Sequence, residues 1–149
     1  MDSPQRDPDC IFCKIVAGEI PATKVLEDDQ VLAFMDIGPV AQGHVLLIPK
    51  HHYERIDEMP PARAGAVLSQ LPAIVAAAGL ATGAAGVNVL QNNGRIAGQL
   101  VPHVHFHIIP RLPGGAFRFN WPAGEYPEGR MDELAGLIRQ NIEKEAETK

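Results

Sequence analysis

One feature constrains the chain more than any other: histidines at three alternate positions, His103, His105 and His107. Successive side chains of a β-strand point to opposite faces. A strand over residues 103–110 therefore places the three imidazoles on one face, with successive pairs about 7 Å apart at a rise of ~3.3 Å per residue. The side chains between and after them are apolar: Val104, Phe106 and Ile108. We expect one chemical face and one packing face.

The other apolar segments indicate the rest of the sheet. Four more strands are expected, over residues 23–27, 30–35, 44–49 and 86–91, and the first two are joined by a hairpin turn at Asp28-Asp29. One or two helical turns are expected over residues 10–18. A helix over 61–79 is kinked at Pro72 and ends at Gly79, and a last helix starts near Asp132. Runs of strands with segregated helices are typical of an α+β antiparallel sheet.

Length and composition narrow the class of protein. With 149 residues and 46% hydrophobic residues, the chain is expected to form a disordered tail over 1–9 and a single domain over 10–149. The formal charge of -5 argues against binding of polymeric nucleic acid or an anionic membrane. Residues 65–94 carry no charge, yet polar residues and glycines interrupt them, which favours a core helix and a buried strand over a membrane span. No signal peptide is recognisable, so we expect a cytoplasmic protein.

The alternating imidazoles are suited to two kinds of chemistry. They can contribute to a metal site, or they can supply a nucleophile with its acid and base partners. The loop just before them contains small and amide residues, a pattern typical of an anion-binding nest: Asn92, Asn93, Gly94, Ala97, Gly98 and Gln99. Together the two features favour phosphorus chemistry, in which an imidazole attacks phosphorus and forms a covalent intermediate.

Cys10 and Cys13 form a C-x-x-C pair, the only cysteines of the chain. Two cysteines so close together are a poor disulfide framework, and a redox pair would need a βαβ context that the pattern does not predict. Two thiolates need two further ligands for a closed tetrahedral zinc site. The alternative is a pair of reduced, buried cysteines.

The segment QNNGRIAGQLVPHVHFHIIPR, residues 91–111, resembles the signature of the histidine-triad (HIT) family. The likeness extends to CIFCKIVAGEIPATKV and VLAFMDIGPVAQGHVLLIPKHH, and it is similar to the bacterial Hint branch over residues 10–112. The resemblance implies a five-stranded antiparallel sheet with one long central helix and a C-terminal helix. It also implies a homodimer in which the sheet continues from one protomer to the other.

The resemblance implies a role for each triad residue. His105 matches the nucleophile, which attacks the α-phosphorus of a nucleotide, and His107 would contact the phosphate. His44 would hydrogen-bond near the nucleophile and help to set its tautomer. Asp36 matches the ligand of the ribose hydroxyls. The base pocket would be formed by three apolar side chains, Ile37, Phe12 and Phe34.

The loop positions also match those of the family. Asn92 corresponds to the amide residue near sugar and phosphate, and Gly98 and Gln99 correspond to phosphate-loop positions. The next position is often Ser or Thr in the family, but it is Leu100 here. Only the backbone N–H of Leu100 is then available to the substrate, which leaves the preference for a leaving group open.

Bacterial relatives that this chain resembles pair their C-x-x-C with two histidines, here His52 and His103. The implied ligand set is thus Cys10, Cys13, His52 and His103, holding a structural zinc with no open position. No organic cofactor is expected. His51 is left as a surface residue or as a competitor of His52.

Several functions remain open at this level. The first is hydrolysis of purine nucleoside phosphoramidates, and the second is hydrolysis of dinucleoside polyphosphates, with the same nucleophile. The others are a non-catalytic nucleotide-binding protein and a zinc-binding interaction module. Trp121 either reaches the active site of a partner protomer or packs locally.

Overall fold

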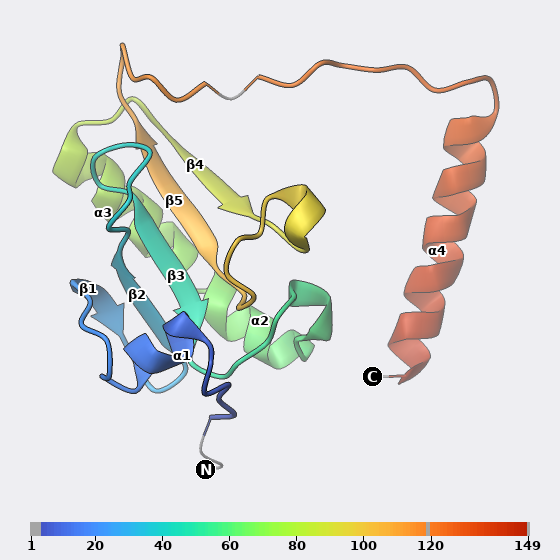
Figure 1. Cartoon of the computed structure of the whole chain (residues 1–149). Coiled ribbons are helices and arrows are strands. Elements are labelled where there is room, and N and C mark those ends of the chain that lie inside the picture. Colours follow the sequence, from blue (N-terminus) through green and yellow to red (C-terminus); the bar gives the residue numbers. More distant parts are fainter. Residues whose placement is uncertain (1–3, 119, 149) are drawn as a thin grey trace. The chain divides into compact units, whose positions relative to one another are not determined.

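The computed structural model describes residues 4–118 and 120–148 (Figure 1). The chain divides into two compact units, Met1–Phe117 and Arg118–Lys149. The first unit contains the sheet, and the second contains a single helix. Trp121 lies in the second unit, and the expected domain limits of 10 and 149 stay a prediction.

The first unit is built on a five-stranded antiparallel sheet in the order β1-β2-β3-β5-β4. This confirms the predicted α+β antiparallel architecture. The strands are β1 Lys24–Glu27, β2 Val31–Met35, β3 Val45–Pro49, β4 Gly86–Gln91 and β5 Phe106–Arg111. The expected hairpin turn is also confirmed, because Asp28 Oδ1 accepts the backbone N–H groups of Gln30 and Val31 at 2.8 Å each.

The sheet is covered on both faces, and the side chains of its central strands divide between two cores. Odd-numbered residues of β2 and β3, such as Val31 and Leu47, join a core with α2 Pro61–Leu68 and α3 Leu71–Thr82. Even-numbered residues, such as Leu32 and Ile48, join a second core with α1 Ile11–Val16. The two-residue period of a strand thus separates a structural face from the face that carries the site.

The central helix differs from the prediction of one helix kinked at Pro72. It is divided at Ser69–Gln70, and Pro72 falls in the first turn of α3, where a missing backbone N–H removes no helical hydrogen bond. The helix also continues past Gly79 to Thr82, where Gly83 closes it with a left-handed φ of 68°.

The helical segment Pro61–Thr82 is long and apolar enough to cross a membrane, with a mean hydropathy of 1.7, and 17% of that window is buried. Its buried side chains pack into the core with the sheet: Val67, Ile74 and Ala78. The segment therefore packs on the sheet through one face only, and strand β4, which we expected to be buried, has no buried residue.

The strand of the histidines begins later than predicted. β5 starts at Phe106, so residues 103–105 precede the strand: His103 lies in a bend, and the Val104 N–H donates to the Tyr53 carbonyl at 2.8 Å. The ladder between β3 and β5 ends at the pair Leu47 and Phe106. Farther along β3, Pro49 has no N–H to donate, and its carbonyl accepts the His103 ring instead.

Two short 3-10 helices and one long α-helix complete the structure. η1 Ile56–Glu58 follows β3, and η2 Arg95–Ala97 lies in the loop between β4 and β5. α4 Arg130–Thr148 forms the second unit and begins two residues before the expected Asp132. Its apolar residues Leu137, Ile138 and Ile142 are exposed.

Candidate functional site

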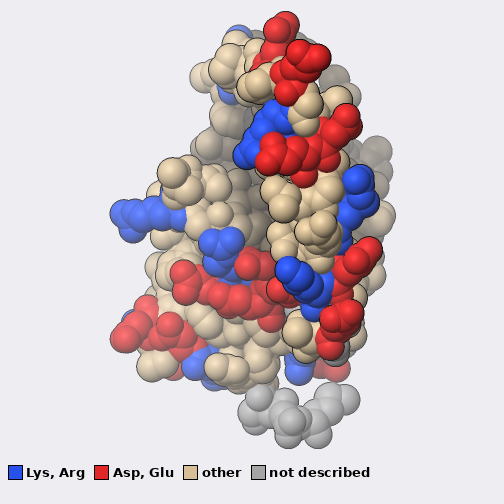
Figure 2. Space-filling view, turned by 90° about the vertical axis from the view of Figure 1, so that its right-hand side faces the viewer, with Lys and Arg blue, Asp and Glu red and all other residues tan. Residues whose placement is uncertain are grey.

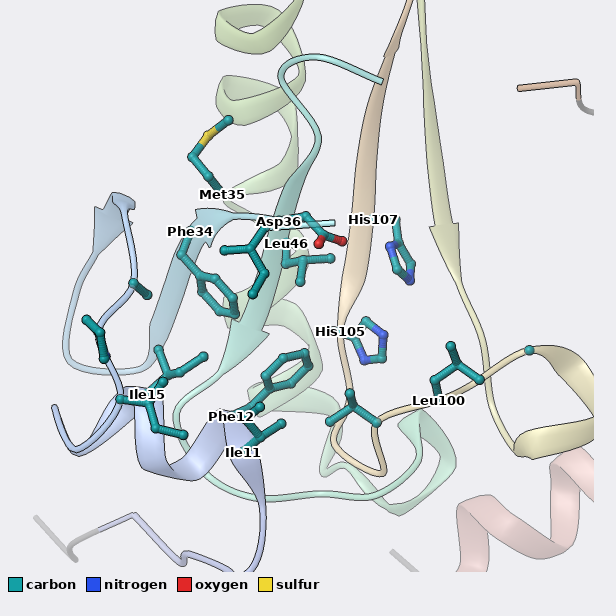
Figure 3. Close-up of a pocket in the computed structure, with 16 residues that line it drawn as sticks. Ile11, Phe12, Ile15, Phe34, Met35, Asp36, Leu46, Leu100, His105 and His107 are labelled. Carbon is teal, nitrogen blue, oxygen red and sulfur yellow. The ribbon is translucent and has the colours of Figure 1, made fainter. Parts of the chain in front are cut away.

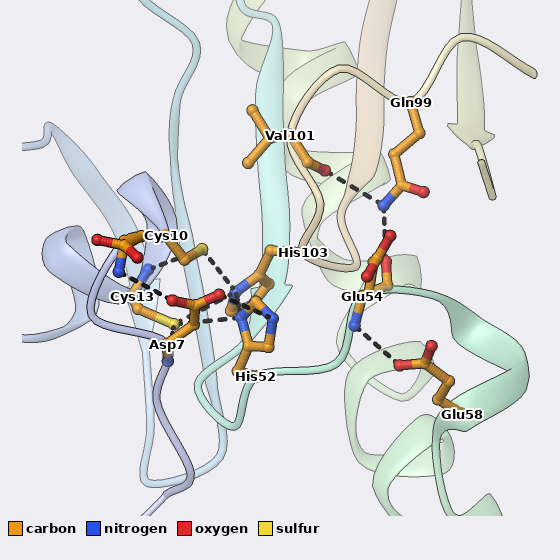
Figure 4. A network of polar contacts seen from close by, with 10 residues as sticks. Asp7, Cys10, Cys13, His52, Glu54, Glu58, Gln99, Val101 and His103 are labelled. Carbon is orange, nitrogen blue, oxygen red and sulfur yellow. Dashed lines mark hydrogen bonds and ion pairs between the residues drawn. The ribbon is translucent and has the colours of Figure 1, made fainter. Parts of the chain in front are cut away.

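The first cluster brings together the four predicted metal ligands (Figure 4). Cys10 Sγ lies 3.4 Å from His103 Nδ1, and Cys13 Sγ lies 3.4 Å from His52 Nδ1 and 3.7 Å from His103 Nδ1. The two Nδ1 atoms are 3.1 Å apart. Three of the residues are buried, and His52 is partly buried.

Local structure explains why these side chains converge. Cys10 is the N-cap of α1, and its sulfur accepts the N–H of Cys13 at 3.4 Å, so both sulfurs lie at the first turn of that helix. The His103 ring donates Nε2–H to the Pro49 carbonyl at 2.8 Å. A neutral imidazole has only one N–H, so Nδ1 of His103 presents its lone pair to the two sulfurs.

The donor set suits a tetrahedral zinc ion. Bonds of about 2.3 Å to sulfur and about 2.0–2.1 Å to nitrogen separate a sulfur from a nitrogen by about 3.5 Å in that geometry. The cluster already has this spacing. Burial raises the pKa of the Cys13 thiol to about 11, so a thiolate there needs a nearby cation. His51 stacks on Tyr53 and has its Nδ1 occupied by the Gln5 N–H, so His52 is the histidine of the cluster.

The second cluster contains the predicted nucleophile. His105 Nδ1 lies 2.7 Å from the His103 carbonyl oxygen. A carbonyl only accepts, so His105 carries its proton on Nδ1 and its lone pair on Nε2. The ring is 6% exposed, lines a pocket and meets Phe12 edge-on with centroids 5.2 Å apart. The geometry leaves one nucleophilic nitrogen, held in a fixed orientation.

A chain of hydrogen bonds sets the tautomers of the other two histidines. The Val40 N–H donates to His44 Nδ1 at 3.3 Å, so the His44 proton is on Nε2. That Nε2–H donates to His107 Nδ1 at 2.9 Å, and the proton of His107 is therefore on Nε2. Asp36 Oδ2 lies 3.6 Å from His44 Nε2. The partner of His44 is thus His107, which lies beside the nucleophile, while the tautomer of His105 is set by the His103 carbonyl.

Burial keeps these histidines neutral at pH 7. It lowers the pKa of His107 to about 4, with the charges of His105 and His44 acting in the same direction. It also lowers the pKa of His44 and of His105, against an opposing effect of Asp36 in both cases. A neutral imidazole is the form that has a nucleophilic lone pair.

The pocket beside these histidines has a volume of about 280 Å³. Figure 3 shows Phe12 and Phe34 on one side, His105 and His107 on the other, and the Asp36 carboxylate on the His107 side. Its lining includes all three residues predicted for the base: Phe12, Phe34 and Ile37. Apolar surface with a few convergent polar groups is typical of a small-molecule site.

The loop between β4 and β5 forms another edge of the pocket through Gly98 and Leu100. The N–H groups of Gly98 and Gln99 donate to carbonyls within the loop, and so does that of Ala97. The Leu100 N–H has no hydrogen-bond acceptor within residues 4–118 and 120–148. Leu100, and not the two residues before it, therefore offers a donor to a phosphate.

Two predicted loop residues have structural contacts. Gln99 is buried and its side chain donates to the Glu54 and Val101 carbonyls at 2.6 and 3.2 Å, while its oxygen accepts the Gly94 N–H. Asn92 lies next to Gly98, where an added Cβ would come 3.5 Å from Asn92 Nδ2. The Gln99 side chain holds the loop in shape, and neither residue lines the pocket. A direct nucleotide contact of these side chains stays a prediction.

The HIT domain family matches residues 17–114 of the chain. An uncharacterized HIT-like protein of Methanocaldococcus jannaschii is 53% identical over 130 residues, which cover 87% of this chain and 98% of that protein. An adenosine 5'-monophosphoramidase of Candida albicans is 38% identical, with 91% and 92% of the two chains covered.

Solved structures are similar over most of the chain. A Streptococcus mutans protein superposes with a TM-score of 0.88 at 42% identity and covers 92% of this chain and 87% of that one. A zinc-bound histidine triad family protein of Mycobacterium smegmatis superposes with a TM-score of 0.70 at 34% identity, with coverage of 89% and 97%.

Proposed function

The chain belongs to the HIT family, and from that premise we propose that it hydrolyses purine nucleoside phosphoramidates at the α-phosphorus through a nucleotidyl-His105 intermediate. Relatives named as adenosine 5'-monophosphoramidases support a nucleotide hydrolase in general. The observation that carries the proposal is the hydrogen bond from His105 Nδ1–H to the His103 carbonyl, which leaves Nε2 as the nucleophile at the pocket.

The nucleotide would bind with its base between the apolar side chains and its ribose hydroxyls on Asp36. One oxygen of Asp36 already accepts the Gly38 N–H at 2.8 Å, so the carboxylate is held in place. His107 Nε2–H and the Leu100 N–H would donate to the phosphoryl oxygens. Donors that are fixed before the reaction stabilise charge as it develops in the transition state.

Two displacements complete the reaction. In the first, the His105 Nε2 lone pair forms a bond to phosphorus while the P–N bond breaks, and the amine departs with a proton carried by the substrate itself, because neutral His107 would become an imidazolate if it gave up its Nε2–H. In the second, water attacks phosphorus, the Nε2–P bond breaks, and the nucleoside monophosphate leaves. Neutral His105 is regenerated, and the proton released by water leaves with the nucleoside monophosphate or with solvent.

The named activities of the relatives differ in the leaving group. A relative in Arabidopsis thaliana, 46% identical over 74% of this chain and 56% of its own, is named as an adenylylsulfatase. Leu100 is 78% exposed and has no hydroxyl to offer a leaving group. Dinucleoside polyphosphate hydrolysis is the second candidate, because the same nucleophile serves it.

Parallel turnover assays of an adenosine phosphoramidate and a diadenosine polyphosphate test the proposal. We expect the phosphoramidate to be cleaved faster, with a radiolabelled adenylyl group transiently bound to the wild type. His105→Ala should lower kcat on the order of a thousandfold or more and still bind AMP. Undiminished turnover in His105→Ala would refute the nucleophile, and cleavage of neither substrate would favour a non-catalytic nucleotide-binding protein.

We also propose that Cys10, Cys13, His52 and His103 hold a structural zinc. The spacing of the four donor atoms and the zinc-bound relative support this assignment. A closed four-ligand zinc has no open position, so it takes no part in the reaction. Its contribution would be to hold His103, whose carbonyl orients the nucleophile.

We also propose that the protein is a homodimer and is located in the cytoplasm. A homodimer with a continuous sheet is supported by strand β4, which pairs only with β5 among residues 4–118 and 120–148 and so has an open edge. The acidic and basic side chains are interspersed on the face in Figure 2, which does not favour a partner of one charge, such as nucleic acid. Two thiolate ligands suit a reducing compartment, so we place the protein in the cytoplasm, away from membranes.

A further inference from the structure

The segment of residues 5–9, which the sequence does not predict to contact the domain, lies across the outside of the Cys/His cluster. The His52 N–H donates to the Gln5 carbonyl at 2.8 Å, and the Gln5 N–H donates to His51 Nδ1 at 3.0 Å. The His51 ring is in turn stacked on Tyr53, with centroids 4.8 Å apart. The segment is therefore attached to the same short loop that carries His52.

Asp7 is the residue of this segment that meets the cluster itself (Figure 4). Its N–H donates to Cys13 Sγ at 3.4 Å, and its carbonyl accepts the Cys10 N–H at 3.2 Å. Its carboxylate Oδ2 lies 4.0 Å from His52 Nε2, at ion-pair range. One residue thus touches three of the four candidate ligands through three different groups.

The carboxylate of Asp7 is itself oriented. Its other oxygen, Oδ1, accepts the Asp9 N–H at 2.8 Å, which turns Oδ2 toward His52. His52 has its Nδ1 in the cluster and its Nε2 on the Asp7 side. A carboxylate outside a metal site can fix the tautomer and raise the basicity of a metal-binding imidazole; at 4.0 Å, Asp7 Oδ2 is beyond a direct hydrogen bond to His52 Nε2 and acts on it through its charge.

We propose that Asp7 is a positioning residue of the metal site, and that residues 5–9 are its outer wall. The proposal rests on the zinc assignment made above. A metal on Nδ1 withdraws electron density from the ring of His52 and makes its Nε2–H more acidic, so the attraction to Asp7 Oδ2 increases when the site is loaded. The Asp7 N–H offers a thiolate at Cys13 a hydrogen bond that apolar surroundings would not supply.

Residues 5–9 are connected to the nucleophile through His103. His103 joins the two clusters, because its Nδ1 belongs to the metal site and its carbonyl holds His105 Nδ1–H. Residues 5–9 are thus connected to the nucleophile through the metal site and His103.

The test compares the zinc affinity of the full-length wild type, Asp7→Asn and Asp9→Asn. Asp9 is the matched control, because it is an exposed acid two residues away, so both variants change the net charge equally. Zinc affinity is measured by competition with a chromophoric chelator, and the melting temperature of the metal-free proteins reports on folding. We expect Asp7→Asn to weaken zinc binding by about 10- to 100-fold at an unchanged stoichiometry, and Asp9→Asn to bind like the wild type.

A second pair tests the backbone contact. Gln5→Pro removes the N–H that His51 accepts, whereas Gln5→Ala keeps it, so only the proline variant should release zinc faster. Equal affinities of Asp7→Asn and the wild type would overturn the proposal and leave the zinc assignment standing. Complete loss of zinc from Asp7→Asn would overturn it too, because Asp7 would then be a ligand. A wild type that binds no zinc would refute the zinc assignment itself.

Discussion

His103 and His105 lie two residues apart, and in each of them a backbone carbonyl accepts the N–H of the ring. The bound nitrogen is Nε2 in His103, which donates to Pro49, and Nδ1 in His105, which donates to His103. The nitrogen that remains is therefore Nδ1 in the first case and Nε2 in the second. One lone pair faces two sulfurs, and the other faces a pocket.

The environments of His103 and His105 differ in how far they enclose the remaining ring nitrogen. Around His103, four donor atoms lie close together, and the ring itself is 0% exposed. Around His105, aromatic side chains and a carboxylate border a cavity of about 280 Å³. The same residue type thus becomes a structural ligand or a nucleophile according to which ring nitrogen the backbone occupies and whether the remaining one meets other donors or open space.

The largest expected effect follows from removing one ligand of the proposed zinc site. Cys13→Ser should lose the bound zinc, and a ligand present at a thousand times its Kd contributes about 4 kcal/mol to the free energy of unfolding. For a chain of this size that is a decrease in Tm of about 8–16 °C. Calorimetry of zinc-loaded protein measures it.

Chelation provides the control for that variant. A chelator should lower the Tm of the wild type to that of Cys13→Ser and should leave the variant unchanged. If Cys13→Ser retains zinc and the wild-type Tm, Cys13 is not a ligand.

A substitution at Gly43, the residue before His44, should have the next largest effect. Gly43 has a φ of +85°, and a Cβ there would lie 2.5 Å from Thr82 Cγ2 and 3.2 Å from Pro110 Cγ. We expect Gly43→Ala to lower the free energy of unfolding by about 2–4 kcal/mol, from the left-handed backbone and the clash together. Urea denaturation measures the change.

Gly18→Ala is the matched control, since Gly18 has a φ of +78° and a Cβ added there would meet no atom within 4 Å. Gly18→Ala should lower the free energy of unfolding by only about 1–2 kcal/mol. Equal costs at the two positions would show that the contact of Gly43 with α3 and β5 is not tight.

Removing the hydrogen bond from His44 to His107 should lower the rate of the reaction more than the stability of the fold. His44→Asn loses the Nε2–H that holds His107, and we expect kcat to fall about 10- to 100-fold with little change in KM. His44→Gln extends an amide donor toward the position of Nε2 and should retain more activity than His44→Asn. Equal activity of the two variants would argue against the hydrogen bond to His107 as the cause.

The last expected effect concerns the response of the fold to acid. The pKa of His107 is about 4 in the folded protein and near 6.5 in the unfolded chain, so the unfolded state binds more protons between these values. The buried neutral ring therefore destabilises the fold progressively as the pH falls from 6.5 to 4. The wild type should lose more stability than His107→Asn over this interval in parallel melts, and parallel curves would contradict the assignment.

Much of this fold can be predicted from patterns in the chain. The apolar runs of Val31–Met35 and Val45–Pro49 predict the strands β2 and β3, and the position of Asp28 predicts the turn between β1 and β2. The limits of elements were less predictable, because they depend on partners. β5 begins at Phe106 since Pro49 on the opposite strand cannot continue the ladder, a fact about two segments 57 positions apart that no local pattern contains.

The residue types and their spacing alone determined that imidazoles, thiols and a loop of small residues are available for chemistry. They also determined which side chains of a strand share a face. Only the tertiary structure decided how each group is used. The tautomers of His44, His103 and His105 depend on the Val40 N–H and on carbonyls supplied by Pro49 and His103. Gln99 holds its loop, and Asp7 reaches the Cys/His cluster, for the same reason: hydrogen-bond partners are chosen by proximity in space, which the order of residues does not reveal.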